Sequence, residues 1–226
     1  MSESLHFAAH RLQELALGFM AVVYAVRIAW FLRFKAGGDR QAPARGAGRP
    51  PVRGVLYSWA IIGMPWAMES TRRRPFLWIQ FVVFHLGVTA AIALSFMIPY
   101  GPGMLEDRGL VLFLQVLIGS ALAVGVMRIV RRVGNRYMRA ISSPDDYFSL
   151  VLLTAWFFFA VLAAPNDPAR GEWRLLAFFI LTAFFLIYVP FSKISHYLYY
   201  PFTRFYLGRT LAHRGVYPIR RVAEGR

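Results

Sequence analysis

The sequence predicts an all-α integral membrane protein with five transmembrane helices, its N-terminus outside and its C-terminus in the cytoplasm. Three observations support this fold class. The apolar fraction of 58% and the aromatic fraction of 16% are higher than those of a typical soluble domain. Five apolar runs are long enough, at about 1.5 Å per residue, to cross a hydrocarbon core of about 30 Å. The charged residues are few, yet they sum to +15 and gather between these runs.

The first crossing is expected at 12–32, after a polar lead at 1–11. Residues 36–53 are rich in Gly, Pro, Ala and Arg, which bury little apolar surface, so we expect a mobile loop there. Residues 55–68 are apolar and aromatic but too few to cross a membrane. We therefore expect a short interfacial segment before the second crossing.

Four further crossings follow, at 75–98, 110–130, 147–164 and 173–200. Pro75 suits the first position of a helix, because the N–H group that proline lacks would have no helical partner there. Gly and Ala residues between 119 and 125 give the third crossing a surface on which another helix can pack closely. Residues 12–206 are thus expected to form one membrane domain, followed by a basic cytoplasmic tail at 207–226.

The basic residues predict the orientation. Most of the 26 Lys and Arg residues follow crossings one, three and five, and only a few lie at the N-terminus or after crossings two and four. Because loops rich in Lys and Arg stay in the cytoplasm, the N-terminus is expected outside. These residues lie in short loops between apolar runs, so we interpret them as topology signals rather than as a nucleic-acid surface.

The chain has no cysteine. It therefore forms no disulfide, no thiolate zinc site and no iron–sulfur cluster of its own.

Two histidines, His85 and His196, lie well inside apolar runs, where an ionisable side chain is costly and usually faces a cofactor, a cavity or a partner. If both runs are continuous helices, the two residues lie about 16 Å and about 12 Å from the same cytoplasmic face. Two imidazoles at one level can supply both axial ligands of a haem. Lys193, Arg204 and Arg74, with the neighbouring arginines at 72 and 73, are the cations available to its propionates. The alternative is that each histidine hydrogen-bonds to a neighbouring helix.

Two motifs carry a resemblance to a known family. The segment PFSKISH at 190–196 resembles the last helix of the cytochrome b (gamma) subunit of respiratory nitrate reductase, and FHLGV at 84–88 resembles its second helix. Relatives of that family include membrane subunits of heterodisulfide reductase and of sulfite-reductase-associated complexes. The family pattern has two more histidines, at positions that here are Ser95 and Phe178. Both belong to the outer haem, so the resemblance implies a single haem b on the cytoplasmic side.

The resemblance implies an electron-transfer subunit in a bacterial inner membrane. Electrons would pass between quinone and a cytoplasmic iron–sulfur subunit, heterodisulfide-reductase-like or ferredoxin-like, through one haem held by His85 and His196. The expected alternative is a redox-inactive membrane anchor that tethers a cytoplasmic complex. A small transporter is disfavoured, because the crossings lack paired acidic residues and a broken-helix repeat.

His6, His10 and Glu14 would share one face of a continuous helix at the outer interface. That spacing fits a metal site or a contact with a quinol headgroup. We favour a solvated face at the start of the first crossing, because no third firm ligand is evident.

Overall fold

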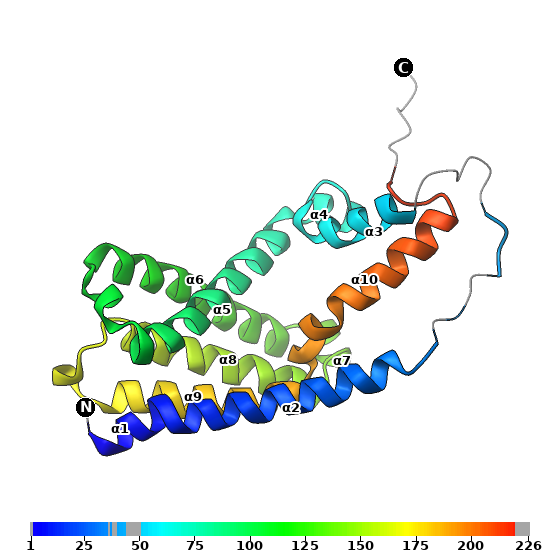
Figure 1. Ribbon diagram of the computed structural model, residues 1–226. Coiled ribbons are helices and arrows are strands. Elements are labelled where there is room, and N and C mark those ends of the chain that lie inside the picture. The colour runs from blue at the N-terminus through cyan, green and yellow to red at the C-terminus, as the bar shows by residue number, and fades with distance from the viewer. Residues whose placement is uncertain (1, 36, 38–39, 44–50, 220–226) are drawn as a thin grey trace. The chain divides into compact units, whose positions relative to one another are not determined.

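A computed structural model describes residues 2–35, 37, 40–43 and 51–219, apart from the side chains of three of them. These residues form helices and connecting turns, with no strand among them (Figure 1). Five helical stretches are long and apolar enough to cross a membrane: Glu3–Leu32, Pro75–Tyr100, Arg108–Gly134, Pro144–Ala163 and Trp173–Phe191. The predicted all-α class with five membrane-spanning helices is confirmed. The predicted mobile loop lies mostly outside the described residues.

The chain divides into two compact units. The first comprises Met1–Val26 and Ile79–Ser195, and the second comprises Arg27–Trp78 and His196–Arg226. The single membrane domain expected at 12–206 is therefore split between them.

The first membrane-spanning stretch is longer than predicted. It consists of α1 (Glu3–Phe7), the π-helical turn η1 (Ala8–Leu12) and α2 (Gln13–Leu32). Ser2 caps α1, because its hydroxyl accepts a hydrogen bond from the Leu5 amide at 3.3 Å. The capped lead therefore continues the helix, and the predicted boundary at residue 12 marks only the change from polar to apolar residues.

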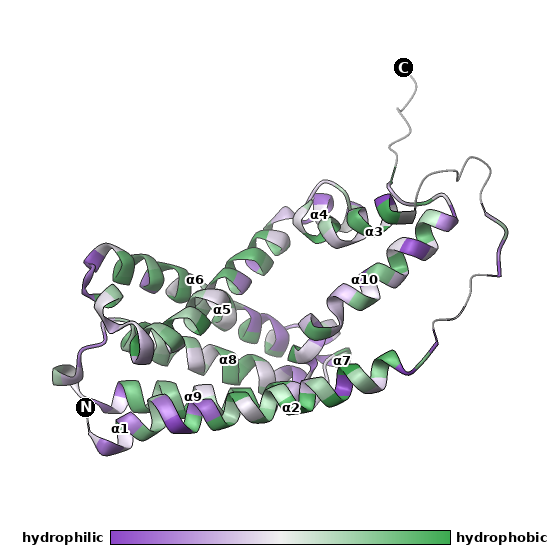
Figure 2. Cartoon of the chain, viewed as in Figure 1, coloured by the Kyte–Doolittle hydropathy of each residue, from purple (hydrophilic) through white to green (hydrophobic). Residues whose placement is uncertain are grey.

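The remaining long helices of the first unit are α5 (Pro75–Tyr100), α6 (Arg108–Gly134), α8 (Pro144–Ala163) and α9 (Trp173–Tyr188), of which α5 begins in the second unit. The turn η3 (Pro102–Glu106) joins α5 to α6, α7 (Arg136–Ala140) joins α6 to α8, and η4 (Pro168–Arg170) precedes α9. Apolar residues cover most of these helices, whereas polar residues gather at their ends (Figure 2). Bulky side chains such as Leu112 of α6 stay 61% exposed, as expected of a surface that contacts lipid.

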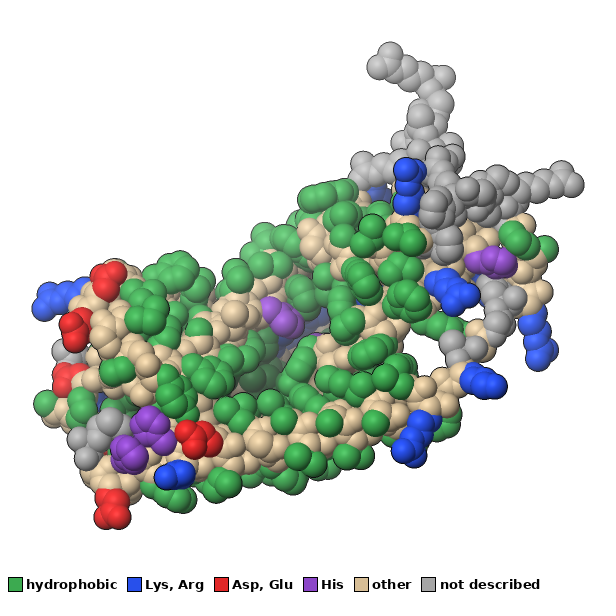
Figure 3. Space-filling view, in the orientation of Figure 1, with side chains coloured by type: hydrophobic (Ala, Val, Ile, Leu, Met, Phe, Trp, Pro, Cys, Tyr) green, Lys and Arg blue, Asp and Glu red, His purple; other side chains and the backbone are tan. Residues whose placement is uncertain are grey.

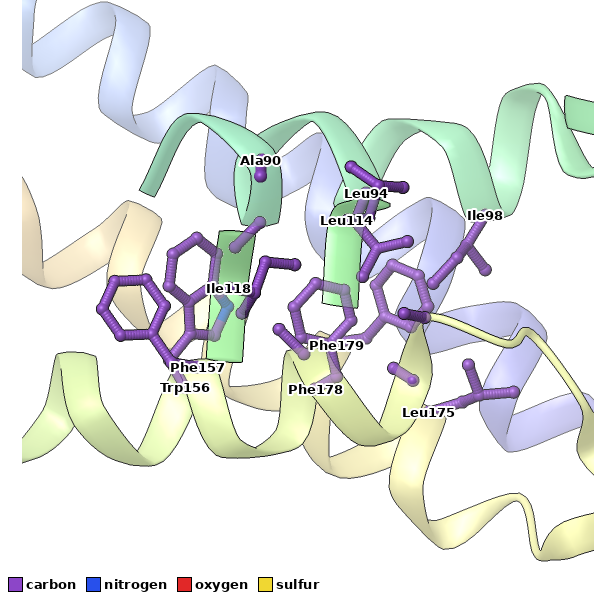
Figure 4. Packing of buried hydrophobic residues seen from close by; sticks show 14 of the residues in the cluster. Ala90, Leu94, Ile98, Leu114, Ile118, Trp156, Phe157, Leu175, Phe178 and Phe179 are labelled. Carbon is purple, nitrogen blue, oxygen red and sulfur yellow. The ribbon is translucent and has the colours of Figure 1, made fainter. Parts of the chain in front are cut away.

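Aromatic rings fill the core of the first unit (Figure 4). Phe157 of α8 and Phe178 and Phe179 of α9 are completely buried, beside Ile118 of α6 and Leu94 of α5. The indole Nε1 of the neighbouring Trp156 donates a hydrogen bond to Thr182 Oγ1 at 2.9 Å, which satisfies its polar atom inside the core. These contacts fix α8 and α9 against α5 and α6.

Small residues let α6 approach its neighbours, as the sequence predicted. A Cβ added to Gly87 of α5 would come within 2.1 Å of the Ala121 Cβ, and one added to Gly125 would come within 2.6 Å of Thr154 Oγ1 on α8. Gly119 has open space instead, with no atom within 4 Å of an added Cβ. Only part of the small-residue stretch is therefore used for packing inside this chain.

The fifth membrane-spanning helix is shorter than the predicted 173–200. After α9, the chain forms the short turns η5 (Val189–Phe191) and η6 (Lys193–Ser195), and α10 (His196–His213) is a separate helix of the second unit. Pro190 cannot donate a helical hydrogen bond, and Ser192 is extended, with φ −102° and ψ 170°. These two residues end the crossing. The expected tail at 207–226 begins as the last turns of α10.

In the second unit α10 packs on α3 (Pro51–Ala60), which continues as η2 (Ile61–Gly63) and is followed by α4 (Glu69–Arg73). The indole of Trp59 donates to the Pro201 carbonyl at 2.9 Å, and the Tyr200 hydroxyl donates to the Trp59 carbonyl at 3.0 Å. The Tyr206 hydroxyl donates to the Gly37 carbonyl at 2.5 Å. These hydrogen bonds tie the N-terminal half of the second unit to its C-terminal helix.

Candidate functional site

His85 lies on the exposed side of α5, in the first unit. Its Nδ1 is 2.7 Å from the Phe81 carbonyl oxygen, one helical turn earlier. A carbonyl oxygen can only accept, so Nδ1 carries the hydrogen, and the neutral ring then has its lone pair on Nε2. This tautomer, fixed by a backbone carbonyl, is the form in which histidines commonly bind metals. The ring of Phe81 lies beside that of His85, with 4.1 Å between the two ring centroids and 46° between the ring planes.

Arg128 of α6 is a further candidate, which the sequence reasoning missed. Its guanidinium carbon lies 4.6 Å from the ring centroid of Phe84, and the ring of Phe84 lies 6.2 Å from that of His85. Arg128 is half-buried, and the described residues provide no carboxylate within salt-bridge distance of it. A positive charge inside an apolar helix could have signalled the site, because such charges are rare at membrane depth.

His196 is the first residue of α10 and lines an open groove of about 520 Å³. The groove also includes Tyr199, Tyr200, Thr203, Arg204 and Leu207. All of these residues belong to α10, so the groove is an open surface along one side of that helix. The guanidinium of Arg204 lies over the ring of Tyr200, with 5.5 Å from its central carbon to the ring centroid. The structure thus brings together two residues that the sequence predicted as ligand and propionate partner.

The two predicted axial ligands belong to different units, His85 to the first and His196 to the second. The depth predicted for His196 assumed one continuous fifth crossing. The apolar stretch that is long enough to cross the membrane ends at Phe191, so that estimate of depth does not apply to His196.

Lys193 and Arg74, the other predicted propionate partners, have different surroundings. The Nζ of Lys193 lies 2.8 Å from the Asp146 Oδ2 and 2.8 Å from the Ser143 hydroxyl, both at the start of α8. Arg74 is exposed where α4 ends. Of the three predicted cations, only Arg204 shares a groove with a predicted ligand.

The positions that hold histidine in the resembled pattern are occupied by core residues. Phe178 is completely buried, and its ring stacks on Trp156 with 6.0 Å between centroids. The buried Ser95 donates its hydroxyl to the Ile92 carbonyl, and its own carbonyl accepts from the Gln13 amide at 3.1 Å. Both positions are therefore used for packing between helices.

The histidines near the N-terminus form an aromatic cluster. The rings of His6 and His10 are 4.6 Å apart, and the Tyr100 ring meets His10 edge-on at 5.4 Å. The Tyr100 hydroxyl donates to the Glu14 carboxylate at 2.9 Å. No group of three or more metal-binding side chains occurs in the described parts of the chain. The ring contact of His10 with Tyr100 and the hydrogen bond of Tyr100 to Glu14 link the first crossing to the end of α5.

Figure 3 shows where charged side chains gather on the first unit. On the face shown, acidic side chains are visible at the end that carries the N-terminus, and Asp145 and Asp146 lie at the start of α8. Three arginines, at positions 128, 131 and 132, lie toward the C-terminal end of α6. The candidate ligand His85 and the charge of Arg128 are thus associated through Phe84, and His196 and Arg204 share one groove. Each unit by itself thus offers one imidazole with an aromatic ring and an arginine near it.

Comparisons with known proteins give no activity. No family model matches the chain, and no solved structure matches it significantly. A curated protein of Nitratidesulfovibrio vulgaris (strain Hildenborough) is 28% identical over 168 residues, which cover 71% of this chain and 73% of that protein. That protein bears only the name "Protein", which states no function. What these comparisons add is a bacterial relative of similar extent.

Proposed function

We propose that this chain is a membrane-embedded b-type cytochrome subunit. It passes electrons between the quinone pool and a cytoplasmic iron–sulfur oxidoreductase subunit. The observation that carries the proposal is the hydrogen bond from His85 Nδ1 to the Phe81 carbonyl, since it gives the imidazole its metal-binding tautomer. His85 and His196 are the axial ligands of one haem b in this proposal.

A bound haem supplies one-electron redox chemistry, and the protein sets its potential through ligands, charge and water exclusion. The imidazoles of His85 and His196 would hold the iron. Arg204, which shares the groove of His196, and Arg128, which lies over Phe84, compensate the negative charge of the propionates. Aromatic side chains lie beside both histidines, Phe81 beside His85 and Tyr200 in the groove of His196, and would flank the ring of a bound haem.

A single haem is supported by the residues at positions 95 and 178. Phe178 is part of the aromatic core and cannot ligate iron, and the hydroxyl of Ser95 is hydrogen-bonded within α5. Because the chain has no cysteine, the iron–sulfur clusters must belong to another subunit. By resemblance to the nitrate reductase gamma subunit family, that partner is heterodisulfide-reductase-like or ferredoxin-like.

The location follows from the same resemblance and from the charges. We propose a bacterial inner membrane, with the N-terminus outside and the basic loops in the cytoplasm. The basic residues support this orientation, because five arginines, at positions 128, 131, 132, 136 and 139, lie between the apolar parts of the third and fourth crossings.

The test is the reduced-minus-oxidised optical spectrum of the purified protein, together with its haem content per polypeptide. We expect one low-spin b haem. His85→Ala and His196→Ala should each abolish the low-spin spectrum, whereas His213→Ala, in the last turn of α10, should leave it unchanged. Absence of haem from the intact protein, or a normal spectrum in either ligand variant, would refute the proposal.

The second candidate is a redox-inactive anchor that tethers a cytoplasmic complex. It is favoured by the charge of the second unit, whose described residues include eleven Lys or Arg, eight at 27–78 and three at 196–219, and one acidic residue, Glu69. Such a surface can bind an acidic partner without a cofactor. An anchor would keep the quinone-linked activity of its partner in the His85→Ala variant, and the cytochrome would lose it.

A further inference from the structure

The helix α3 has two apolar faces. One face packs on α10 through Gly54 and Ser58, which are both buried. Away from these two residues the helix exposes Val52, Leu56 and Trp59, with exposed fractions of 60%, 55% and 42%, although the indole N–H of Trp59 also reaches the Pro201 carbonyl of α10. These three residues are spaced by four and then three positions, so they form one stripe along the helix. We call this stripe, Val52, Leu56 and Trp59, the α3 stripe.

Arginines lie near the α3 stripe, one on α3 itself and three farther along the chain. Arg53 is exposed within the same helical turn, and Arg72, Arg73 and Arg74 are exposed a short distance along the chain. Across the described residues of the second unit, only Glu69 is acidic. It forms an ion pair with Arg73. The partner of this surface must therefore be apolar in one part and anionic in another.

A cleft in the same unit supplies a polar contact. Arg72 lines a cavity of about 170 Å³ with Tyr57, Met64, Trp66, Ala67 and Ile219. An arginine beside aromatic rings suits a phosphate group, because guanidinium binds phosphate with two parallel hydrogen bonds. Trp66 is also 59% exposed, and exposed tryptophans are enriched where proteins meet the headgroups of a bilayer.

The apolar segment Val52–Gly63 is too short to cross a membrane. A short helix with an apolar stripe, flanking arginines and tryptophan has the composition of helices that lie in the plane of the membrane. We propose that the α3 stripe inserts into the interface of a bilayer that contains anionic phospholipid, with Arg53 and Arg72 at the level of the lipid phosphates. This inference does not depend on haem or on the proposed function.

The inserted stripe gives the second unit a membrane anchor of its own. The unit carries His196 and Arg204, so its attachment to lipid limits the positions that these residues can take. An apolar and basic surface can also bind an acidic protein, and the experiment below distinguishes that partner from lipid.

The absence of cysteine allows a direct test, because a single introduced cysteine carries the only spin label. The full chain, placed in nanodiscs of phosphatidylcholine with or without phosphatidylglycerol, would carry the label at Leu56→Cys. Val116→Cys, at an outward position of α6 that is 57% exposed, gives the lipid reference. Glu106→Cys, in the exposed turn η3, gives the aqueous reference. Accessibility to oxygen and to a water-soluble nickel chelate locates each label.

We expect the label at residue 56 to resemble that at 116, with at least several-fold less access to the nickel chelate than at 106. The protection should increase with phosphatidylglycerol, and Arg53→Gln with Arg72→Gln should remove that increase. Nickel access equal to that at residue 106 in both lipids would overturn the proposal. So would protection that appears only when a partner protein is added. A label at Val52→Cys repeats the measurement if the first variant folds poorly.

Discussion

The carbonyl oxygen of Gly54 faces the Cα of Gly208 where α3 and α10 cross. A Cβ added to Gly208 would come within 2.7 Å of that oxygen and within 2.6 Å of the Val55 Cα. Real Cβ atoms do not approach backbone so closely, so the two helices can meet at this distance only with glycine at residue 208. The second unit therefore depends on this crossing.

Gly208→Ala should destabilise the second unit by about 1–3 kcal/mol, because the helices must separate to admit the methyl group. The change is measurable as a lower unfolding temperature and as greater protease cleavage between residues 51 and 75. Gly119→Ala is the matched control, since nothing lies within 4 Å of its added Cβ. Alanine there should be neutral or stabilising by up to about 1 kcal/mol. Equal effects of the two substitutions would contradict the close crossing.

Adding a methyl group at residue 87 of α5 and removing the one at residue 121 of α6 tests how closely these two helices pack. Gly87→Ala should destabilise it by about 1–3 kcal/mol, because the new Cβ would lie 2.1 Å from that of Ala121. Adding Ala121→Gly should recover part of the loss, since it removes the clashing atom. The unfolding free energies of the two single variants and of the double variant give the coupling between them. Additive losses would show that residues 87 and 121 are not in contact.

Arg128→Gln should keep the haem but lower its midpoint potential, if the proposed function holds. Loss of a nearby positive charge stabilises the oxidised form, and partial burial limits screening, so we expect a shift on the order of tens of millivolts. A redox titration of the b-band absorbance measures it. Arg136→Gln, in the exposed start of α7, is the control and should change the potential much less. An unchanged potential with full haem content would show that Arg128 is not close to the haem. It would not contradict the assignment of His85 and His196 as ligands.

Replacing Asp146 with alanine should destabilise the start of α8 more than replacing Lys193 does. The Asp146 carboxylate accepts hydrogen bonds from the Ser143 amide and from the Lys193 ammonium, both at 2.8 Å. Asp146→Ala removes the capping box and the ion pair together and should cost about 1–2 kcal/mol. Lys193→Ala removes the ion pair and a hydrogen bond to the Ser143 hydroxyl, but the lysine is 60% exposed, so we expect less than about 1 kcal/mol. Thermal unfolding of both variants checks this order.

The fold class was predictable because apolar length alone identifies membrane crossings. The ends of the crossings were less predictable, since proline does not determine them by itself. Pro190 ends the fifth crossing, whereas Pro201 lies inside α10 and Pro99 lies in the last turns of α5. The helix ends near Pro190 because Ser192, two residues later, has an extended backbone. The amino-acid composition of this segment does not predict that backbone conformation.

The candidate site was predictable only where its contacts are local. His196 and Arg204 are eight residues apart on one helix, so their shared groove follows from helical spacing. Lys193 pairs with Asp146, which is 47 residues away, and Arg128 lies over Phe84, which is 44 residues away. Those partners depend on how helices pack, which hydropathy does not specify.

The π-helical turn at Ala8–Leu12 has a consequence for the register of the first crossing. A π turn holds one residue more than an α turn, and one residue of an α-helix corresponds to a rotation of about 100°. Deleting one residue from this turn would restore regular α-helical winding. The deletion would also rotate the part of the helix before the turn, which contains His6, relative to the part after it. In the part after the turn, the buried Gln13 donates a hydrogen bond to the Ser95 carbonyl. The contact of the first crossing with α5 at Ser95 and the position of the His6 end thus depend together on the extra residue of this turn.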